Sequence, residues 1–462
     1  MTLIKSISGI RGTIGGGLGD NLTPVDIVKF VSAYGQWLKI RTAKDAYTVI
    51  VGRDARTSGP MVNHLVSGTL IGMGIDTLEL GLATTPTVEL AVVNEKADGG
   101  IIITASHNPG EWNALKLLNE KGEFLSASDG QIIVDLAEAE SLSYPEVGEL
   151  GKSKHHGPYH QNHIEDIINL ALVNTESIRK ANLTVVVDCV NSVGGLIIPD
   201  LLKALGVSKV IELYCDPSGI FPHNPEPLPE NLTDLFEKVK KSGADLGFVV
   251  DPDVDRLAIV NEDGTFFGEE YTLVAVADFI LKNNPGNTVS NLSSTRALKD
   301  VTEQYRANYF SSAVGEVNVV EEMKKQNAVI GGEGNGGVIY PGLHYGRDAL
   351  VGIAFFLTHL AESGEKCSEL RAQYPDYFIV KSKFGLNPEL NFEKVISEVK
   401  EKFSGYPNTT IDGIRVDIDK EWIHIRKSNT EPIVRIIAES SSVKRSEELI
   451  KVVGEILNRL NG

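Results

Sequence analysis

Apolar, β-branched runs that end in polar or glycine-rich loops recur along the chain. Three segments begin with such a run and continue as a helix-like pattern after the loop, at residues 47–59, 183–195 and 287–298. Each is followed by a second apolar run with a conspicuous loop at its end, at residues 99–110, 246–256 and 327–337. Short apolar runs bounded by Gly, Asn and Asp are typical of strands. We interpret the pattern as a weak threefold repeat of strand–loop–helix units.

Amphipathic helical stretches such as residues 231–243 alternate with these strands. The alternation predicts mixed, largely parallel sheets, in which loops at the carboxyl ends of the strands build the ligand site. After about residue 372 the pattern changes to a helix at 391–403, two strands around a polar loop at 422–440 and a final helix. We therefore predict three related mixed α/β domains and a C-terminal α+β domain, with bounds at 1–150, 151–256, 257–372 and 373–462.

Composition narrows the classes of partner. The chain has 462 residues with 44 Lys plus Arg against 62 Asp plus Glu, a net charge of -18, which repels nucleic acid and anionic membranes. Anionic ligands then need local cationic pockets. Three scattered cysteines, Cys189, Cys215 and Cys367, do not suit a disulfide framework and favour a reducing, cytoplasmic setting. The first residues do not resemble a signal peptide, and no run is long enough to span a bilayer.

The sequence DPDVDR at residues 251–256 is the strongest local signal for chemistry. Asp251, Asp253 and Asp255 alternate, so an extended chain projects all three carboxylates to one side. Clustered carboxylates repel one another unless a hard cation neutralises them, and Mg²⁺ fits best. Two alternatives stand beside this reading. One is a calcium-binding helix–loop–helix with Glu262 at its twelfth position, although Arg256 replaces the turn glycine; the other is a solvated turn without metal.

Ser106 follows the strand predicted before residue 104, in the sequence TASHNP. Read alone, it is as well explained as a helix N-cap or turn former. A hydrolase nucleophile elbow is disfavoured, because Ala105 and His107 stand where that turn needs glycine. Together with a magnesium site, however, a serine oxygen favours phosphoryl chemistry, which depends on positioning and charge neutralisation. Lys116 could supply a cation or a proton there, or be an ordinary exposed lysine.

Two further loops carry candidate binding groups. The sequence RKSNTEPIVR at 426–435 gathers cations, hydroxyls and turn amides that suit a phosphate dianion, although a hairpin with charged flanks is an alternative. The sequence GGEGNGG at 331–337 presents Glu333 in a flexible glycine frame, where a carboxylate can accept hydrogen bonds from hydroxyls. No Lys-Ser/Thr follows it, so it is a poor phosphate loop, and a plain mobile loop is the alternative.

Five ordered sequences resemble the successive signatures of the α-D-phosphohexomutases: SGIRG at 8–12, TASHNP at 104–109, DPDVDR, GGEGNGG and RKSNTEPIVR. The resemblance covers the whole chain and implies four domains around one central cleft. It implies a phosphoserine enzyme that interconverts hexose 6-phosphates and hexose 1-phosphates through a sugar bisphosphate, which also acts as activator. The expected partners are these small molecules.

The resemblance also implies a role for each site residue. Ser106 would carry the phosphoryl group and, with Asp251, Asp253 and Asp255, hold Mg²⁺. The remaining positions fall into three groups, namely cations and support near the transferred group, sugar contacts, and phosphate contacts. They are, in that order, Arg11, Lys116, His107, Asn108 and Arg256; Glu333, Asn335 and Glu316; and Arg426, Ser428, Asn429, Thr430 and Arg435.

Two sequence features bear on the preferred sugar. Asn335, Gly336 and Gly337 stand where glucose and mannose enzymes of the family carry a serine and a histidine, and Glu316 occupies a place that is acidic in glucosamine-type members. An acidic side chain can pair with a substrate ammonium. We therefore expect glucosamine 6-phosphate as substrate, with a glucose or mannose phosphate as the alternative. A metal-dependent serine phosphatase and a non-catalytic phosphosugar-binding protein are the remaining classes.

Overall fold

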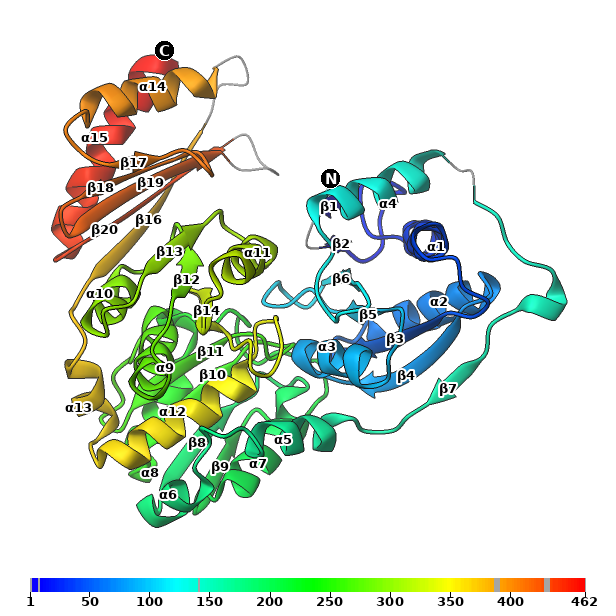
Figure 1. The fold of residues 1–462 in the computed structure, drawn as a ribbon, viewed down its shortest axis with the longest axis horizontal. Coiled ribbons are helices and arrows are strands. Elements are labelled where there is room, and N and C mark those ends of the chain that lie inside the picture. The colour runs from blue at the N-terminus through cyan, green and yellow to red at the C-terminus, as the bar shows by residue number, and fades with distance from the viewer. Residues whose placement is uncertain (1, 7–8, 140–141, 386–390, 428–432, 462) are drawn as a thin grey trace.

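The computed structural model describes residues 2–6, 9–139, 142–385, 391–427 and 433–461. It contains four sheets, one for each predicted domain, and the chain visits them in order. Figure 1 shows the first domain on the right, the second and third below and in the centre, and the C-terminal domain at the upper left. The predicted class, three mixed α/β domains followed by an α+β domain, is confirmed.

The first domain is built on a seven-stranded sheet of order β1-β2-β6-β5-β3-β4-β7, in which β3 lies parallel to β4 and β5. Its helices lie on both faces of the sheet, as crossover connections between parallel strands require. The elements are β1 (Ile4–Ser6), β2 (Gly9–Thr13), α1 (Pro24–Arg41), β3 (Thr48–Arg53), α2 (Gly59–Gly72), β4 (Asp76–Leu82), α3 (Thr85–Asn94), β5 (Gly99–Ile103), β6 (Trp112–Leu118), α4 (Ala127–Ala139) and β7 (Ser153–His155).

The second and third domains each have a four-stranded sheet, of order β11-β10-β8-β9 and β13-β12-β14-β15. The second contains α5 (His160–Ile168), α6 (Thr175–Ala181), β8 (Thr184–Asp188), α7 (Gly194–Leu205), β9 (Lys209–Leu213), α8 (Thr233–Ser242), β10 (Leu246–Val250) and β11 (Leu257–Asn261). The third contains α9 (Glu269–Asn283), β12 (Thr288–Asn291), α10 (Ala297–Gln304), β13 (Tyr309–Ser312), α11 (Glu316–Gln326), β14 (Ile330–Glu333), β15 (Gly337–Ile339), α12 (Ala349–Ser363) and α13 (Cys367–Ala372).

The C-terminal domain is an antiparallel sheet of order β16-β20-β19-β18-β17 that packs against two amphipathic helices. Its inward positions are Val, Ile and Ala, and they meet the apolar stripes of the helices in one separate core. The elements are β16 (Phe378–Gly385), α14 (Phe392–Lys402), β17 (Asn408–Thr409), β18 (Ile414–Ile418), β19 (Glu421–Lys427), β20 (Ile433–Ser440) and α15 (Val443–Asn461).

The threefold repeat is visible in the strand pairing. In each α/β domain the first strand of the unit is central, and the strand that carries the chemical loop lies parallel beside it: β5 beside β3, β10 beside β8, and β14 beside β12. That strand then reverses into an antiparallel neighbour, namely β6, β11 or β15. Ser106, the aspartate triplet and Glu333 therefore occupy equivalent places, at or after the carboxyl end of the third parallel strand.

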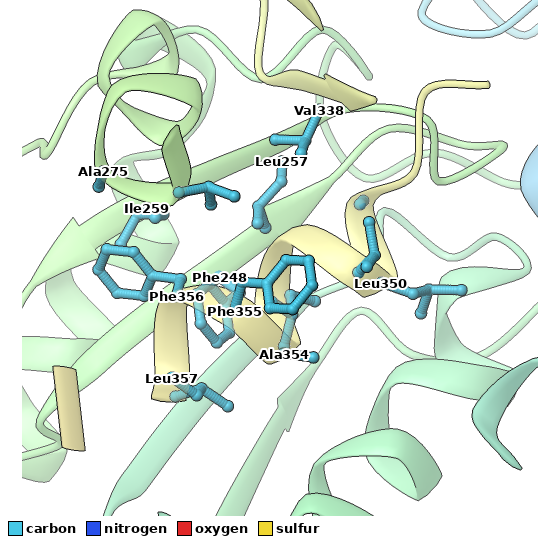
Figure 2. Packing of buried hydrophobic residues seen from close by; sticks show 14 of the residues in the cluster. Phe248, Leu257, Ile259, Ala275, Val338, Leu350, Ala354, Phe355, Phe356 and Leu357 are labelled. Carbon is cyan, nitrogen blue, oxygen red and sulfur yellow. The ribbon is translucent and has the colours of Figure 1, made fainter. Parts of the chain in front are cut away.

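The second and third domains share one hydrophobic core. Helix α12 is apolar around its circumference, so it is buried in the core between the two domains. Asp348 caps its first turn by accepting from Leu350 N and Val351 N, at 2.8 and 3.3 Å. Figure 2 shows Phe356 of α12 close to Phe248 of β10; their ring centroids are 6.0 Å apart, in an edge-on contact. The predicted metal loop (residues 251–256) and the predicted sugar loop (residues 331–337) are thus both supported by this shared core.

The predicted bounds of the first two domains are too early. Strand β7 pairs with β4, so the first sheet continues beyond residue 150. Strand β11 pairs with β10 along Leu246–Val250, so the second sheet continues beyond residue 256. A sheet strand belongs with its hydrogen-bonded neighbour, and this pairing is invisible in the local sequence.

The three cysteines are free thiols. Among the described helices, none is long and apolar enough to cross a bilayer.

Candidate active site

Ser106 lies in a tight loop between β5 and β6 and is almost fully buried. Its φ is +50°, in the left-handed region that non-glycine residues seldom adopt. The backbone N–H of Ser106 donates to Thr104 Oγ1 at 2.9 Å. No described helix follows, because β6 begins at Trp112, so the N-cap interpretation is wrong. The strained turn aims the serine hydroxyl at the loop of the second domain.

Arg56 holds this loop in shape. The guanidinium is fully buried and has five N–H donors, which meet five acceptors. Its Nε donates to Asp54 Oδ2 at 3.0 Å, and its two terminal nitrogens donate to loop carbonyls. These are the carbonyls of Ser106, Asn108 (2.6 Å), Pro109 (2.6 Å) and Trp112 (3.1 Å).

The three aspartates of the second domain are fully buried, and one carboxylate oxygen of each lies within 4.8 Å of the others. Val254, between the second and third, has a φ of +63°, which is unusual for a β-branched residue and turns the loop back on itself. Ser106 Oγ donates to Asp251 Oδ2 at 2.6 Å. The structure therefore brings together the serine and the acidic triplet, 145 residues apart in sequence.

The chemistry of the triplet fits a divalent cation. Asp253 Oδ1 and Asp255 Oδ1 are buried without a hydrogen-bond donor, which is costly unless a cation compensates the charge. Oxygen-only ligands suit Mg²⁺. The solvated-turn reading is wrong, because all three side chains are inaccessible. The calcium-loop reading is also wrong, since Glu262 instead accepts from Ser368 N at 3.0 Å and the flanking segments are strands β10 and β11.

Lys116 of β6 points into the same place. Its Nζ donates to Asp253 Oδ2 at 2.6 Å and to Asp255 Oδ2 at 3.3 Å. Burial opposes the charged amine, but the two carboxylates outweigh burial and raise the pKa of Lys116. Lys116 is therefore a buried, protonated cation, and the exposed-lysine interpretation is wrong.

Glu333 ends β14, where its carboxylate is fixed by three donors. Asn291 Nδ2 and the backbone N–H of Gly315 donate to Oε1 at 2.8 and 3.1 Å, and Arg347 donates to Oε2 at 2.8 Å. The plain-loop interpretation is wrong for this residue. Asn335 shapes its own turn, because its Oδ1 accepts from Gly337 N at 3.2 Å.

Glu316 begins α11 and is also buried. Both of its carboxylate oxygens accept from Arg347, Oε1 from the backbone N–H at 2.9 Å and Oε2 from Nε at 3.1 Å. The same guanidinium reaches Asp255 Oδ2 at 2.7 Å. One arginine thus joins the metal loop to both sugar-reading carboxylates that the sequence proposed.

The supporting residues surround the serine loop. His107 Nδ1 lies 3.4 Å from Ser106 Oγ, and burial, followed by the charge of Arg256, lowers the pKa of His107 well below its usual value. Asn108 Oδ1 is buried without a partner. Arg256 N donates to Asp251 Oδ1 at 3.2 Å. Arg11 of β2 is close enough to Arg256 that burial and this like charge lower its pKa.

The predicted phosphate-binding residues are described only in part. Residues 428–432, which include Ser428, Asn429 and Thr430, lie outside the described residues. Arg426 and Arg435 are directly opposite one another in the β19–β20 pair, so both flank that loop. Arg426 Nε lies 3.7 Å from Asp412 Oδ2, which accepts from Val314 N at 3.1 Å. The predicted phosphate site therefore borders the segment that leads into Glu316.

Comparison with known proteins decides the family. Models of the phosphoglucomutase/phosphomannomutase α/β/α domains I, II and III match residues 3–143, 161–264 and 268–377, and that of the C-terminal domain matches 388–455. The chain belongs to the phosphoglucomutase/phosphomannomutase family. It is a phosphohexomutase, an isomerase of hexose phosphates.

Relatives of this phosphohexomutase have different names. A phosphoglucomutase/phosphomannomutase of Thermococcus kodakarensis is 37% identical over 96% of both chains. A probable phosphoglucosamine mutase of Methanopyrus kandleri is 33% identical over 98% of this chain and 97% of the other. The crystal structure of a Burkholderia thailandensis family protein, 26% identical, superposes with a TM-score of 0.83 over 97% of this chain and 96% of that one.

Sequence reasoning missed Arg56 and Arg347. Both lie at a Gly-Arg-Asp sequence: Arg347 is the arginine of residues 346–348, and Arg56 lies two residues after residues 52–54. An arginine within or just after such a repeated Gly-Arg-Asp sequence, in a chain of strong negative charge, was the available signal. The partners of these two arginines could not be read from the sequence, because several of them lie far along the chain: Ser106 is 50 residues from Arg56, and Asp255 is 92 residues from Arg347.

Proposed function

We propose that this phosphohexomutase interconverts glucosamine 6-phosphate and glucosamine 1-phosphate. The observation that carries the proposal is Glu316, a buried carboxylate beside Glu333, whose two oxygens are oriented by Arg347. Each carboxylate oxygen has more than one acceptor direction, so the remaining lone pairs can receive a substrate ammonium. A charge-assisted hydrogen bond of this kind favours an amino sugar over its hydroxyl counterpart.

Ser106 is the proposed phosphoryl carrier. Phosphoserine gives its phosphoryl group to one hydroxyl of the sugar monophosphate, so the serine P–O bond breaks and a sugar bisphosphate forms. After the bisphosphate turns end for end, Ser106 Oγ attacks the other phosphorus, and the monophosphate isomer leaves. Lys116 contributes fixed positive charge beside the transferred group, since its raised pKa keeps it protonated.

The residues proposed to hold Mg²⁺ are Asp251, Asp253, Asp255 and the oxygen on Ser106. When bound, the ion would neutralise charge on the phosphoryl oxygens. The distal phosphate would rest on Arg426 and Arg435 together with Ser428, Asn429 and Thr430. Two guanidinium forks on paired strands can hold either end of the bisphosphate, because they recognise the phosphate rather than its ester position.

Competing turnover tests the substrate. Purified enzyme, primed with glucose 1,6-bisphosphate, should convert glucosamine 1-phosphate with a kcat/KM at least about tenfold above that for glucose 1-phosphate, a preference of about 1.4 kcal/mol. Glu316→Gln should lose most of this preference. Glu321→Gln, at an exposed position of the same helix, should keep this preference. A wild-type preference for glucose 1-phosphate would contradict the proposal.

A glucose or mannose phosphate is the second candidate. It is favoured by the Thermococcus kodakarensis relative, which is named for those sugars, and by the occupation of both Glu316 oxygens by Arg347. In that case Glu316→Gln would leave the ratio of the two kcat/KM values unchanged.

A further inference from the structure

Arg347 is the point at which the metal loop and the sugar loop meet. It precedes α12, and its side chain is about nine-tenths buried. Its three guanidinium nitrogens reach three different carboxylates, Asp255 at 2.7 Å, Glu333 at 2.8 Å and Glu316 at 3.1 Å. Among the described residues, the Arg347 guanidinium donates to these three carboxylates.

The fork geometry explains why this residue is arginine. Three carboxylates brought this close repel one another, and one guanidinium separates them at fixed angles through its planar donors. Burial opposes the charged form of Arg347, but Asp255, Glu316 and Glu333 together raise its pKa, so it stays charged. A lysine would keep the charge as a point without the three-way fork.

Arg347 is expected to favour sugar binding and to oppose metal binding. Arg347 orients Glu316 and Glu333 for the sugar, which favours sugar binding. At the same time it occupies Asp255 Oδ2, and its positive charge repels a divalent cation placed on the triplet. Removing the cation should thus affect the two ligands in opposite directions, whereas general loosening of the fold would weaken both.

We propose that Arg347 is the positioning residue that fixes the sugar-reading carboxylates Glu316 and Glu333 and, by its hold on Asp255, moderates the metal affinity of the triplet. The inference rests on the proposed roles of the triplet and of the two glutamates. Arg347 acts through these side chains and forms no bond with the reacting phosphorus.

Binding measurements on the full-length protein test this inference. Mn²⁺ affinity is measured by electron paramagnetic resonance, and affinity for glucosamine 6-phosphate and for glucose 6-phosphate by calorimetry. For Arg347→Met, Mn²⁺ should bind about fivefold more tightly. Both sugar phosphates should bind at least about tenfold more weakly, because a charged hydrogen-bond network is lost. Weaker binding of Mn²⁺ as well as of the sugar phosphates, or an unchanged sugar affinity, would overturn the proposal.

Arg347→Lys separates charge from geometry and keeps the test decisive if Arg347→Met does not fold. It should leave Mn²⁺ affinity within about twofold of wild type, because the charge is retained, and still weaken sugar binding. Wild-type sugar affinity in Arg347→Lys would overturn the positioning role. The substrate proposal can fail on its own. If the wild-type enzyme prefers glucose 6-phosphate, that proposal is refuted, but the effect of Arg347 on sugar binding can still be measured with glucose 6-phosphate.

Discussion

Arg56 offers a demanding test of the serine loop. In Arg56→Lys, five donors become three, so at least two of the five acceptors, four loop carbonyls and the Asp54 carboxylate, lose their hydrogen bond from this side chain. Each buried acceptor left unsatisfied costs about 1–3 kcal/mol. Two such losses correspond to a penalty of about 2 kcal/mol for holding Ser106 in place.

Interconversion of the 1- and 6-phosphates, followed by phosphorus NMR, measures the consequence. A penalty of about 2 kcal/mol corresponds to a fall of about thirtyfold in kcat if the loop must be ordered in the transition state. KM should change little, because Arg56 faces the loop and not the sugar. Intact mass after incubation with glucose 1,6-bisphosphate should show less phosphorylated protein than for wild type.

Arg53→Lys is the matched control. Arg53 lies three residues earlier, is half-buried and makes a single side-chain bond to the carbonyl of Asp54, at 3.1 Å. It should retain turnover within about threefold of wild type, as expected for loss of one partly solvated hydrogen bond. Equal activity of the two lysine variants would refute the argument that the carbonyl cage of Arg56 positions Ser106.

Three further outcomes are expected. Ser106→Ala should abolish turnover and the mass gain of one phosphoryl unit from glucose 1,6-bisphosphate, yet leave the affinity for the hexose phosphate nearly unchanged; retained turnover would exclude Ser106 as carrier. EDTA should silence the enzyme and Mg²⁺ restore it, whereas Asp253→Asn should not be restored at the same Mg²⁺ concentration. Alkaline pH should destabilise the protein through His344, whose pKa is raised from 6.5 to about 10, because Asp348 and Glu89 outweigh the burial that lowers it. The native state then holds an extra proton above pH 6.5, so this stabilisation is complete below 6.5 and falls by about 1.4 kcal/mol per pH unit until pH 10. Melting temperatures from pH 6 to 9.5 should therefore drop less steeply for His344→Gln than for His64→Gln, an exposed control, and parallel slopes would contradict this account.

Local patterns carried much of the fold. The apolar runs at 47–59, 183–195 and 287–298 became β3, β8 and β12, because buried parallel strands need continuous apolar residues. Domain ends were less predictable. Strands β7 and β11 belong to the preceding sheets through hydrogen bonds to β4 and β10, and pairing partners leave no mark in a short window.

The site residues also fall into those that a local pattern could predict and those that depend on long-range contacts. The aspartate triplet was readable because its alternation is local, and the structure places Ser106 against it. Arg56 and Arg347 were not recognised, because an arginine is ordinarily a surface residue and only long-range contacts show what it holds. The partial engagement of Glu316 by Arg347 was equally hidden, although Glu316 itself had been singled out.

The common core of the second and third domains determines which parts of this enzyme can move. Helix α12 joins the sheets of both domains in one core, so the loops bearing Asp251, Asp253, Asp255 and Glu333 should move together as one unit. The first domain, with Ser106, and the C-terminal domain, with Arg426 and Arg435, have cores of their own. Opening for a bulky intermediate to rotate should consequently occur mainly by movement of the C-terminal domain, because Ser106 and Lys116 link the first domain to the aspartate triplet.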